Sequence, residues 1–186
     1  MGREVQFMGA WGIRAFESDA GLDAVDFIRK QLPKDGKADL RTILAAMRQE
    51  VCGMCDPAIG QSHSAPMALA EILVKFLDRD IGALDYDNDW AAEDNKFAAL
   101  QSFTADKESL SQIEDYLSES LQALRAQADS GRKWGGWIAE EDWLAWQSHM
   151  EALIDLMDTL IAMPGSQIDF VQTQEPFPTP AMEISS

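Results

Sequence analysis

The sequence predicts a single-domain, all-α protein, built as a bundle-like or orthogonal array of five to six helices. Apolar residues recur at helical spacing in five long segments, and no stretch shows the sustained period-two alternation of a half-buried strand. The length of 186 residues and the 46% hydrophobic composition suit one domain with a sizeable core. Because amphipathic helices must bury their apolar stripes against one another, a packed helical array follows.

Three helices are predicted in the first half of the chain. The segment 19–32 carries apolar residues at helical spacing and has Ser18 or Asp19 as its N-cap. The segment 40–51 has one apolar stripe at positions i, i+3, i+4, i+7 and i+11, and the segment 64–77 has a broad apolar face. Each stripe indicates a helix face that is buried against the other helices.

Two longer helices are predicted in the second half. The first begins at Thr104 or Asp106 and continues to about residue 128, and the second covers 139–163. Large apolar residues cover more than half of the circumference of the second helix, so we expect it to be central. A short helix over 90–100 is also considered, within a dense acidic stretch.

The ends of the chain differ from its middle in composition. Residues 1–7 are expected to form an N-terminal extension, and 8–164 the helical domain. Residues 165–186 hold three prolines among polar residues and are expected to form a mobile tail. A small β element near either end remains an open alternative.

The charge of the chain is its most unusual property. Asp and Glu total 32 against 15 Lys and Arg, for a formal net charge of −17. Such a charge repels phosphate backbones and anionic lipid surfaces, so we expect no direct nucleic-acid binding and no membrane binding. It either keeps the chain soluble and monodisperse or attracts a basic protein partner.

A cytoplasmic location is expected from three further features. The opening residues lack the charged start and apolar run of a secretory signal. No apolar stretch approaches the length that spans a bilayer. Only two cysteines are present, which is too few for a disulfide framework and fits a reducing compartment.

A short motif near the N-terminus resembles the opening of an uncharacterised bacterial family, domain of unknown function 4259. The family begins with Met-Gly-x-Trp-Gly, then a Phe, then an Asp and a helix, and residues 8–19 match this order. A second segment, 64–73, is similar to the Ala-rich helix of that family with its internal Glu. The resemblance covers about the first half of the chain and implies a fold grouping and a bacterial origin, but no chemistry. It also makes Met8 a plausible natural start.

The residues of this motif are interpreted as structural. The two glycines allow backbone conformations that are closed to other residues, the two aromatic side chains anchor the chain end, and the aspartate caps the first helix. A Trp-lined groove for a ligand or partner is the alternative. The motif residues are Gly9, Trp11, Gly12, Phe16 and Asp19.

Cys52 and Cys55 have the spacing of a redox or zinc motif, and His63 follows close by. A reactive pair normally lies at a helix N-terminus, where the dipole favours the thiolate, whereas this pair follows the end of a helix. Zinc sites of this type show two paired ligand clusters, and here His149 is only a distant fourth ligand. We therefore expect buried or half-buried thiols, with zinc binding as a weaker alternative.

The acidic stretch imitates part of a calcium site. Asp85, Asp87 and Asp89 copy the first three acidic positions of an EF-hand loop. The sixth position is Trp90 instead of Gly, and the twelfth is Lys96 instead of Glu, so no EF-hand is predicted. A solvated acidic loop is expected, and weak, irregular binding of a divalent cation is the alternative.

We expect no enzyme activity and no cofactor, because the sequence lacks a phosphate-binding loop, a His-Glu-x-x-His motif and a nucleophile elbow. The favoured hypothesis is an acidic protein-binding module, an immunity or inhibitor-type protein that neutralises a basic bacterial toxin or enzyme. Its predicted partner-binding residues are Asp78, Asp80, Asp85, Tyr86, Asp87, Asp89, Trp90, Glu93 and Asp94.

Two other functions remain open. One is a carboxylate-based, divalent-metal-dependent enzyme or a small-ligand-binding domain, with a pocket formed by Trp134, Trp137, Trp143 and Trp146. Core packing of these tryptophans is the more common outcome. The other is a structural or oligomerisation role.

Overall fold

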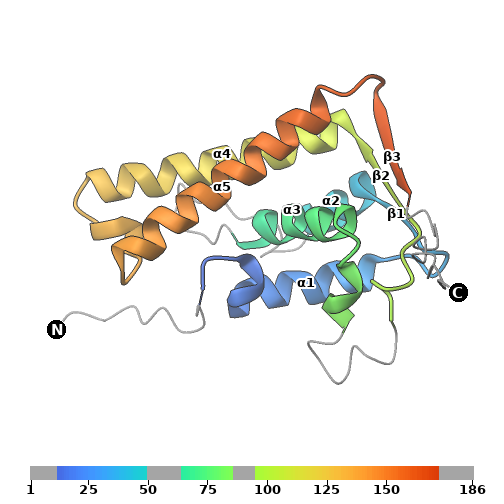
Figure 1. Ribbon diagram of the computed structural model, residues 1–186, viewed down its shortest axis with the longest axis horizontal. Coiled ribbons are helices and arrows are strands. Elements are labelled where there is room, and N and C mark those ends of the chain that lie inside the picture. The colour runs from blue at the N-terminus through green and yellow to red at the C-terminus, as the bar shows by residue number, and fades with distance from the viewer. Residues whose placement is uncertain (1–11, 50–63, 86–94, 172–186) are drawn as a thin grey trace, which may run out of the picture.

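In the part of the chain that the structure describes, five α-helices and a three-stranded sheet form the fold. A computed structural model of the chain describes residues 12–49, 64–85 and 95–171 (Figure 1). The elements are, in order, η1 Ala15–Glu17, α1 Asp19–Gln31, β1 Lys37–Asp39, α2 Leu40–Gln49, α3 Ser64–Leu77, η3 Ile81–Asp85, β2 Ser102–Asp106, α4 Lys107–Asp129, η4 Lys133–Gly136, α5 Glu140–Ile161 and β3 Gln167–Val171. The mainly helical class predicted from the sequence is confirmed.

The helices lie in layers, with α3 in the middle. The long helices α4 and α5 form a hairpin along one side of the molecule, and α1 lies on the other side (Figure 1). Helix α3 contacts α1, α4 and α5, and nearly all of its residues are buried. A helix that is apolar around most of its circumference belongs in the interior, which explains this place.

The sheet closes one end of the helical layers (Figure 1). Its strand order is β1-β2-β3, with β1 parallel to β2 and β2 antiparallel to β3. Phe103 and Ala105 of β2 are fully buried and alternate with half-buried residues. The sequence did not reveal these strands, because two or three alternating positions are too few to stand out as a period of two.

Part of the segment expected to be a mobile tail is a strand instead. Residues 167–171 are strand β3, and they pair with β2 in a register that sets Ile168 opposite Ala105. Ile168 is buried and joins the main core. The composition of residues 167–171 resembles that of a tail. They are nevertheless fixed in the fold by backbone hydrogen bonds to β2 and by the buried side chain of Ile168. Residues 172–186 lie outside the described part of the chain, as do residues 1–11.

The short helix considered for 90–100 is wrong over its described half. Residues 96–99 form turns, and Asn95 has a positive φ of 42°. The backbone amides of Gln101 and Ser102 then donate to the carbonyl of Gly36, which leads the chain into β2. Long-range hydrogen bonds thus decide this segment, whereas residues 90–94 lie outside the described part.

One glycine permits a close contact between two elements near the N-terminus. Gly21 lies in the first turn of α1, and a Cβ atom added there would stand 1.8 Å from the carbonyl oxygen of Ala15. The obstacle is backbone, so it cannot rotate away. The 3₁₀ turn η1 therefore packs directly onto the backbone of α1.

Gly21→Ala is expected to lower the free energy of unfolding by about 2 kcal/mol, because the clash outweighs the gain of about 1 kcal/mol in helix propensity. Chemical denaturation followed by circular dichroism measures the change. Gly82→Ala is the matched control, since its added Cβ meets only Ala98 Cβ at an ordinary 3.5 Å. A stabilised Gly21→Ala protein would contradict the packing of η1 on α1.

Candidate functional site

The start of α1 is capped by Ser18, not by Asp19 as the motif suggested. Ser18 has extended backbone angles, and its Oγ accepts a hydrogen bond of 3.1 Å from Gly21 N. An N-cap residue must have this non-helical conformation, and Asp19 is already the first helical residue. Asp19 is exposed in the first turn, where its charge favours the positive end of the helix dipole.

Two other motif residues lie around the same turn. A Cβ atom on Gly12 would stand 2.2 Å from the carboxylate Oε2 of Glu17, so a larger residue would displace that side chain. Phe16 is half-buried against the core, and Lys75 Nζ lies 5.7 Å from the centre of its ring. Gly9 and Trp11 lie outside the described residues.

A buried carboxylate, Glu71, joins the N-terminal turn to the central and last helices. Both of its oxygens lie 3.1 Å from the backbone nitrogen of Ala15, which donates to them. Its Oε1 also lies 2.6 Å from Nε2 of His149 on α5. Glu71 is only 4% exposed, so the hydrogen bonds with Ala15 and His149 take the place of hydrogen bonds to water.

The two segments that carry the family resemblance therefore contact each other. Ala15 belongs to the motif at 8–19, and Glu71 is the internal Glu of the segment 64–73. No role for Glu71 was predicted from the sequence. A signal was present, because Glu71 is the only acidic residue of α3 and its neighbours along the helix are apolar residues that must be buried.

A carboxylate bonded to an imidazole is an arrangement that also occurs in acid–base catalysis. Such sites require a nucleophile or a substrate pocket next to the imidazole. Within the described residues, the side chain of His149 forms its hydrogen bond with Glu71. The pocket described below lies elsewhere, between α2 and α4. The pair therefore connects α3 to α5 within the described part of the chain.

One residue predicted for the partner surface, Asp85, is not on the surface. Asp85 is fully buried, and its carboxylate accepts hydrogen bonds from the backbone nitrogens of Phe97, at 3.2 Å, and Ala98, at 2.7 Å. These donors belong to the turns at 96–99, which have few backbone partners of their own. Asp85 thus caps a turn and presents no exposed surface to a partner protein.

The carboxylate of Asp85 also faces a buried arginine on α1. The Nε atom of Arg29 lies 3.9 Å from it, and Nη2 donates a hydrogen bond of 2.7 Å to the carbonyl of Leu84. The guanidinium carbon lies 5.3 Å from the centre of the Phe97 ring. Arg29 and Asp85 together connect α1, η3 and the turns that follow the acidic stretch.

The other predicted partner residues divide into two groups. Asp78 and Asp80 are exposed at the end of α3, and Asp80 forms an ion pair of 3.0 Å with Lys75. The remaining predicted residues lie outside the described part of the chain. These are Tyr86, Asp87, Asp89, Trp90, Glu93 and Asp94.

Three of the four tryptophans considered as a ligand pocket pack against one another. The rings of Trp143 and Trp146 stack with centres 5.6 Å apart, and Trp137 lies 6.2 Å from Trp146. Trp146 is fully buried and Trp143 nearly so. Trp134 has a left-handed φ of 52° and is covered by Lys133, whose Nζ lies 4.0 Å from the ring centre.

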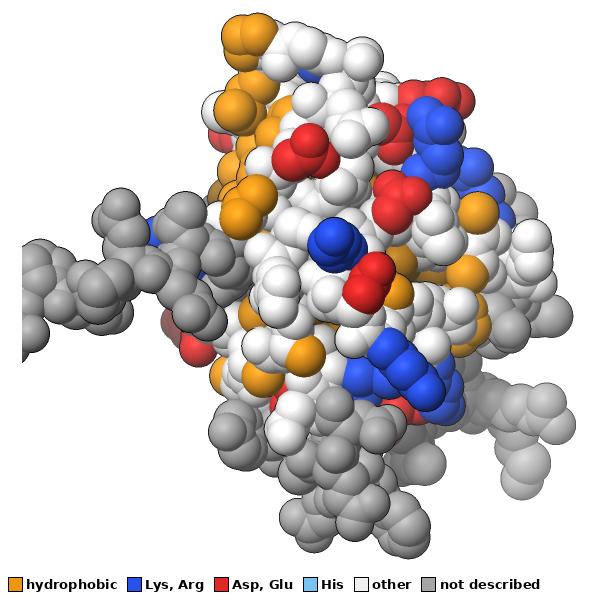
Figure 2. Space-filling view, turned by 90° about the vertical axis from the view of Figure 1, so that its right-hand side faces the viewer, with side chains coloured by type: hydrophobic (Ala, Val, Ile, Leu, Met, Phe, Trp, Pro, Cys, Tyr) orange, Lys and Arg blue, Asp and Glu red, His pale blue; other side chains and the backbone are white. Residues whose placement is uncertain are grey.

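Helix α5 carries carboxylates but neither lysine nor arginine. Its acidic residues are all exposed, and they are Glu140, Glu141, Asp142, Glu151, Asp155 and Asp158. Two large apolar residues are exposed in the same region, Ile138 at 91% and Leu144 at 55%. The sheet end of the molecule differs, because Figure 2 shows basic and acidic side chains interspersed there.

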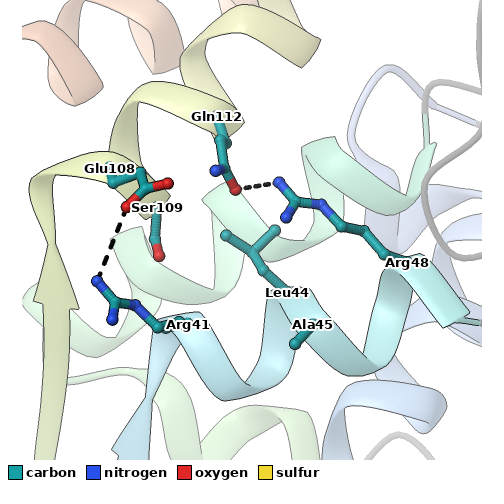
Figure 3. A pocket seen from close by; sticks show the side chains of 7 residues that line it. All are labelled: Arg41, Leu44, Ala45, Arg48, Glu108, Ser109 and Gln112. Carbon is teal, nitrogen blue, oxygen red and sulfur yellow. Dashed lines mark hydrogen bonds and ion pairs between the residues drawn. The ribbon is translucent and has the colours of Figure 1, made fainter.

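A pocket of about 260 Å³ lies between α2 and the start of α4 (Figure 3). Arg41, at one of its ends, forms an ion pair of 2.9 Å with Asp106. Burial would raise the pKa of Asp106, but the hydrogen bonds from Arg41 and Ser109 outweigh it and hold that pKa below its usual value. The hydrogen bond to Asp106 raises the pKa of Arg41 in turn. The ion pair therefore stays charged around neutral pH.

The described residues contain no group of three or more His, Cys, Asp or Glu that could hold a metal ion. Cys52, Cys55 and His63 lie outside them. None of the described helices has the length and apolar character needed to cross a membrane. Comparisons with protein-family models, curated proteins and solved structures found no match. The resemblance to the family of unknown function thus stays a prediction.

Proposed function

We propose that this chain is an acidic protein-binding module that docks on a basic partner, in the manner of an immunity or inhibitor-type protein that neutralises a toxin or enzyme. The net charge of −17 supports an attraction to basic surfaces. The docking surface in this proposal is the α5 outer face. We define this face by Leu144, Glu151, Asp155 and Asp158, which successive 100° turns bring to one side of the helix.

The positions of Asp155 and Asp158 carry the proposal. Both are exposed in the last two turns of α5, where the helix dipole is negative and no basic residue is present. In the last turn a carboxylate such as that of Asp158 costs the helix about 0.3–1 kcal/mol, and this cost falls off towards Asp155. Among the described residues, neither forms an ion pair with a basic side chain that would offset this cost. A contribution to binding outside the chain is the best explanation for their presence.

The acidic residues at the other end of α5 have a structural explanation. Glu140, Glu141 and Asp142 occupy the first turn, where the helix dipole is positive, and the N-cap residue Ala139 offers no side-chain hydrogen bond. Their charges therefore stabilise the start of the helix. This contrast between the two ends separates carboxylates that serve the fold from carboxylates that serve a partner.

The α5 outer face also offers an apolar anchor. Leu144 is more than half exposed, and Glu151 and Asp155 follow it two and three turns further along the same side of the helix. Arg125 of α4 pairs with Glu151 at one flank. An exposed apolar side chain with charged neighbours is a common interface pattern, in which charge steers the encounter and the apolar contact holds the complex.

The double variant Asp155→Lys, Asp158→Lys is expected to slow association with a captured basic partner by about tenfold at low salt, because it reverses the steering field. The same variant is expected to be more stable by about 0.5–1 kcal/mol, since lysine favours the negative end of the helix dipole. Stopped-flow association and thermal unfolding measure the two effects. If the variant binds more slowly and is also more stable, the slower binding results from the changed surface and not from a damaged fold.

Asp23→Lys is the matched control for charge, because Asp23 is exposed on α1, away from the α5 outer face. It changes the net charge by the same amount per residue and should leave the association rate nearly unchanged. Asp78→Lys, Asp80→Lys tests the surface that the sequence favoured. An association rate that responds to Asp78 and Asp80 but not to Asp155 and Asp158 would move the docking surface to the end of α3.

A further inference from the structure

The pocket between α2 and α4 combines an apolar floor with arginines at both ends. Arg41, Ala45 and Arg48 recur at i, i+4 and i+7 and therefore share one face of α2. The first turns of α4 form the opposite wall (Figure 3). The lining residues are Arg41, Leu44, Ala45, Arg48, Glu108, Ser109 and Gln112. Leu44 and Ala45 lie between the two guanidinium groups.

The two arginines differ in how their charges are balanced. Arg41 lies 2.9 Å from Asp106 and 3.9 Å from Glu108, so two carboxylates neutralise it. Arg48 instead donates a hydrogen bond to the neutral side-chain oxygen of Gln112. Within the described part of the chain, no carboxylate lies within ion-pair distance of Arg48. The positive charge of the pocket is therefore concentrated at the Arg48 end.

We propose that this pocket binds a small aliphatic monocarboxylate, with its carboxylate on Arg48 and its hydrocarbon part over Leu44 and Ala45. A guanidinium offers paired donors that match a carboxylate, and the side-chain amide nitrogen of Gln112 can donate a further bond. The volume of about 260 Å³ lies just below the usual range for the pockets of drug-sized ligands, which favours a small ligand.

The charges around the pocket select a ligand with a single negative charge. Glu108 and Asp106 stand at the Arg41 end and would repel a second carboxylate. The net charge of −17 disfavours dianions in general, and inorganic phosphate carries between one and two negative charges at neutral pH. The pocket is separate from the α5 outer face. It is lined by residues of α2 and α4 and is expected to bind an anion, whereas the α5 outer face is acidic and is expected to bind a basic protein.

The test is a titration of the full-length, isotopically labelled protein followed by nuclear magnetic resonance, with butyrate as the probe. Amide signals of 41–48 and 108–112 are expected to shift and to saturate with a dissociation constant of about 1 mM, which corresponds to about −4 kcal/mol. Succinate, inorganic phosphate and butylamine are expected to bind at least about tenfold more weakly. Tighter binding of succinate or phosphate would overturn the assignment to a monocarboxylate.

Two variants connect binding to the pocket. Arg48→Gln removes the charge and is expected to weaken butyrate binding at least about tenfold, as the loss of a charge-assisted pair predicts. Ala45→Leu fills the floor without a change in charge and is expected to abolish saturable binding. Lys34→Gln makes the same change in charge on an exposed turn and should leave the affinity unchanged. Shifts that scatter over the surface, or that persist in Arg48→Gln, mean non-specific binding and overturn the proposal.

Discussion

Replacement of Asp85 by alanine is expected to lower the free energy of unfolding by about 4 kcal/mol, because it removes a buried carboxylate that accepts two backbone hydrogen bonds and faces a buried arginine. The backbone nitrogens of Phe97 and Ala98 would lose their acceptor, and Arg29 would lose its nearest buried negative charge. The Nε atom of Arg29 already lacks a hydrogen-bond partner in the structure. Denaturant titrations of the variant and the unaltered protein measure the difference.

Two comparisons make this result specific. Asp85→Asn keeps one acceptor oxygen for the turn and is expected to cost about half as much, near 2 kcal/mol. Asp80→Ala removes only the exposed ion pair with Lys75 and should cost less than about 1 kcal/mol. If Asp85→Ala is as stable as the unaltered protein, the carboxylate of Asp85 does not stabilise the turn. That result would support the prediction from the sequence that Asp85 belongs to a partner surface.

Glu71→Ala is expected to lower the free energy of unfolding by about 3 kcal/mol, because Ala15 N loses a buried acceptor and His149 loses its partner. The loss is expected to appear locally as well. Hydrogen exchange at the amide of Ala15 should accelerate more than exchange in α4, since Glu71 holds the N-terminal turn against α3.

A graded series distinguishes the two bonds of Glu71. Glu71→Gln retains an oxygen for Ala15 N and is expected to cost about 1–2 kcal/mol. His149→Ala leaves the hydrogen bond from Ala15 intact and should accelerate exchange at that amide less than Glu71→Ala does. Glu119→Ala on the exposed side of α4 is the matched control and should be nearly neutral. Equal exchange rates at Ala15 in all four proteins would show that Glu71 does not fasten the turn.

These buried carboxylates sharpen what the acidity of the chain means. Asp85 and Glu71 contribute to the net charge, yet each is engaged inside the protein. Other carboxylates stabilise helix starts, as Asp106 does for α4. The charge available to a partner is thus smaller than −17 suggests and is concentrated at particular places. This is why the proposal depends on the positions of Asp155 and Asp158 and not on the total charge.

Sequence periodicity was sufficient for the helices and insufficient for the segments between them. The end of α1 at Gln31 and the N-cap of α4 at Asp106 agree with the prediction, because both are set by residues within one helical turn. The turns at 96–99 and strand β3 were missed. Their conformation depends on Asp85, on Gly36 and on β2, which are distant in the sequence.

The sequence by itself determined the five helices, their buried faces and the acidity of the chain, because a 3.6-residue period and a count of charges are local properties. Only the tertiary structure decided which carboxylates are available to a partner. Glu71 meets Ala15 across 56 residues, and Asp85 meets Ala98 across 13. Whether an acidic side chain caps a turn, fastens a helix or faces solvent depends on donors that only folding brings near it.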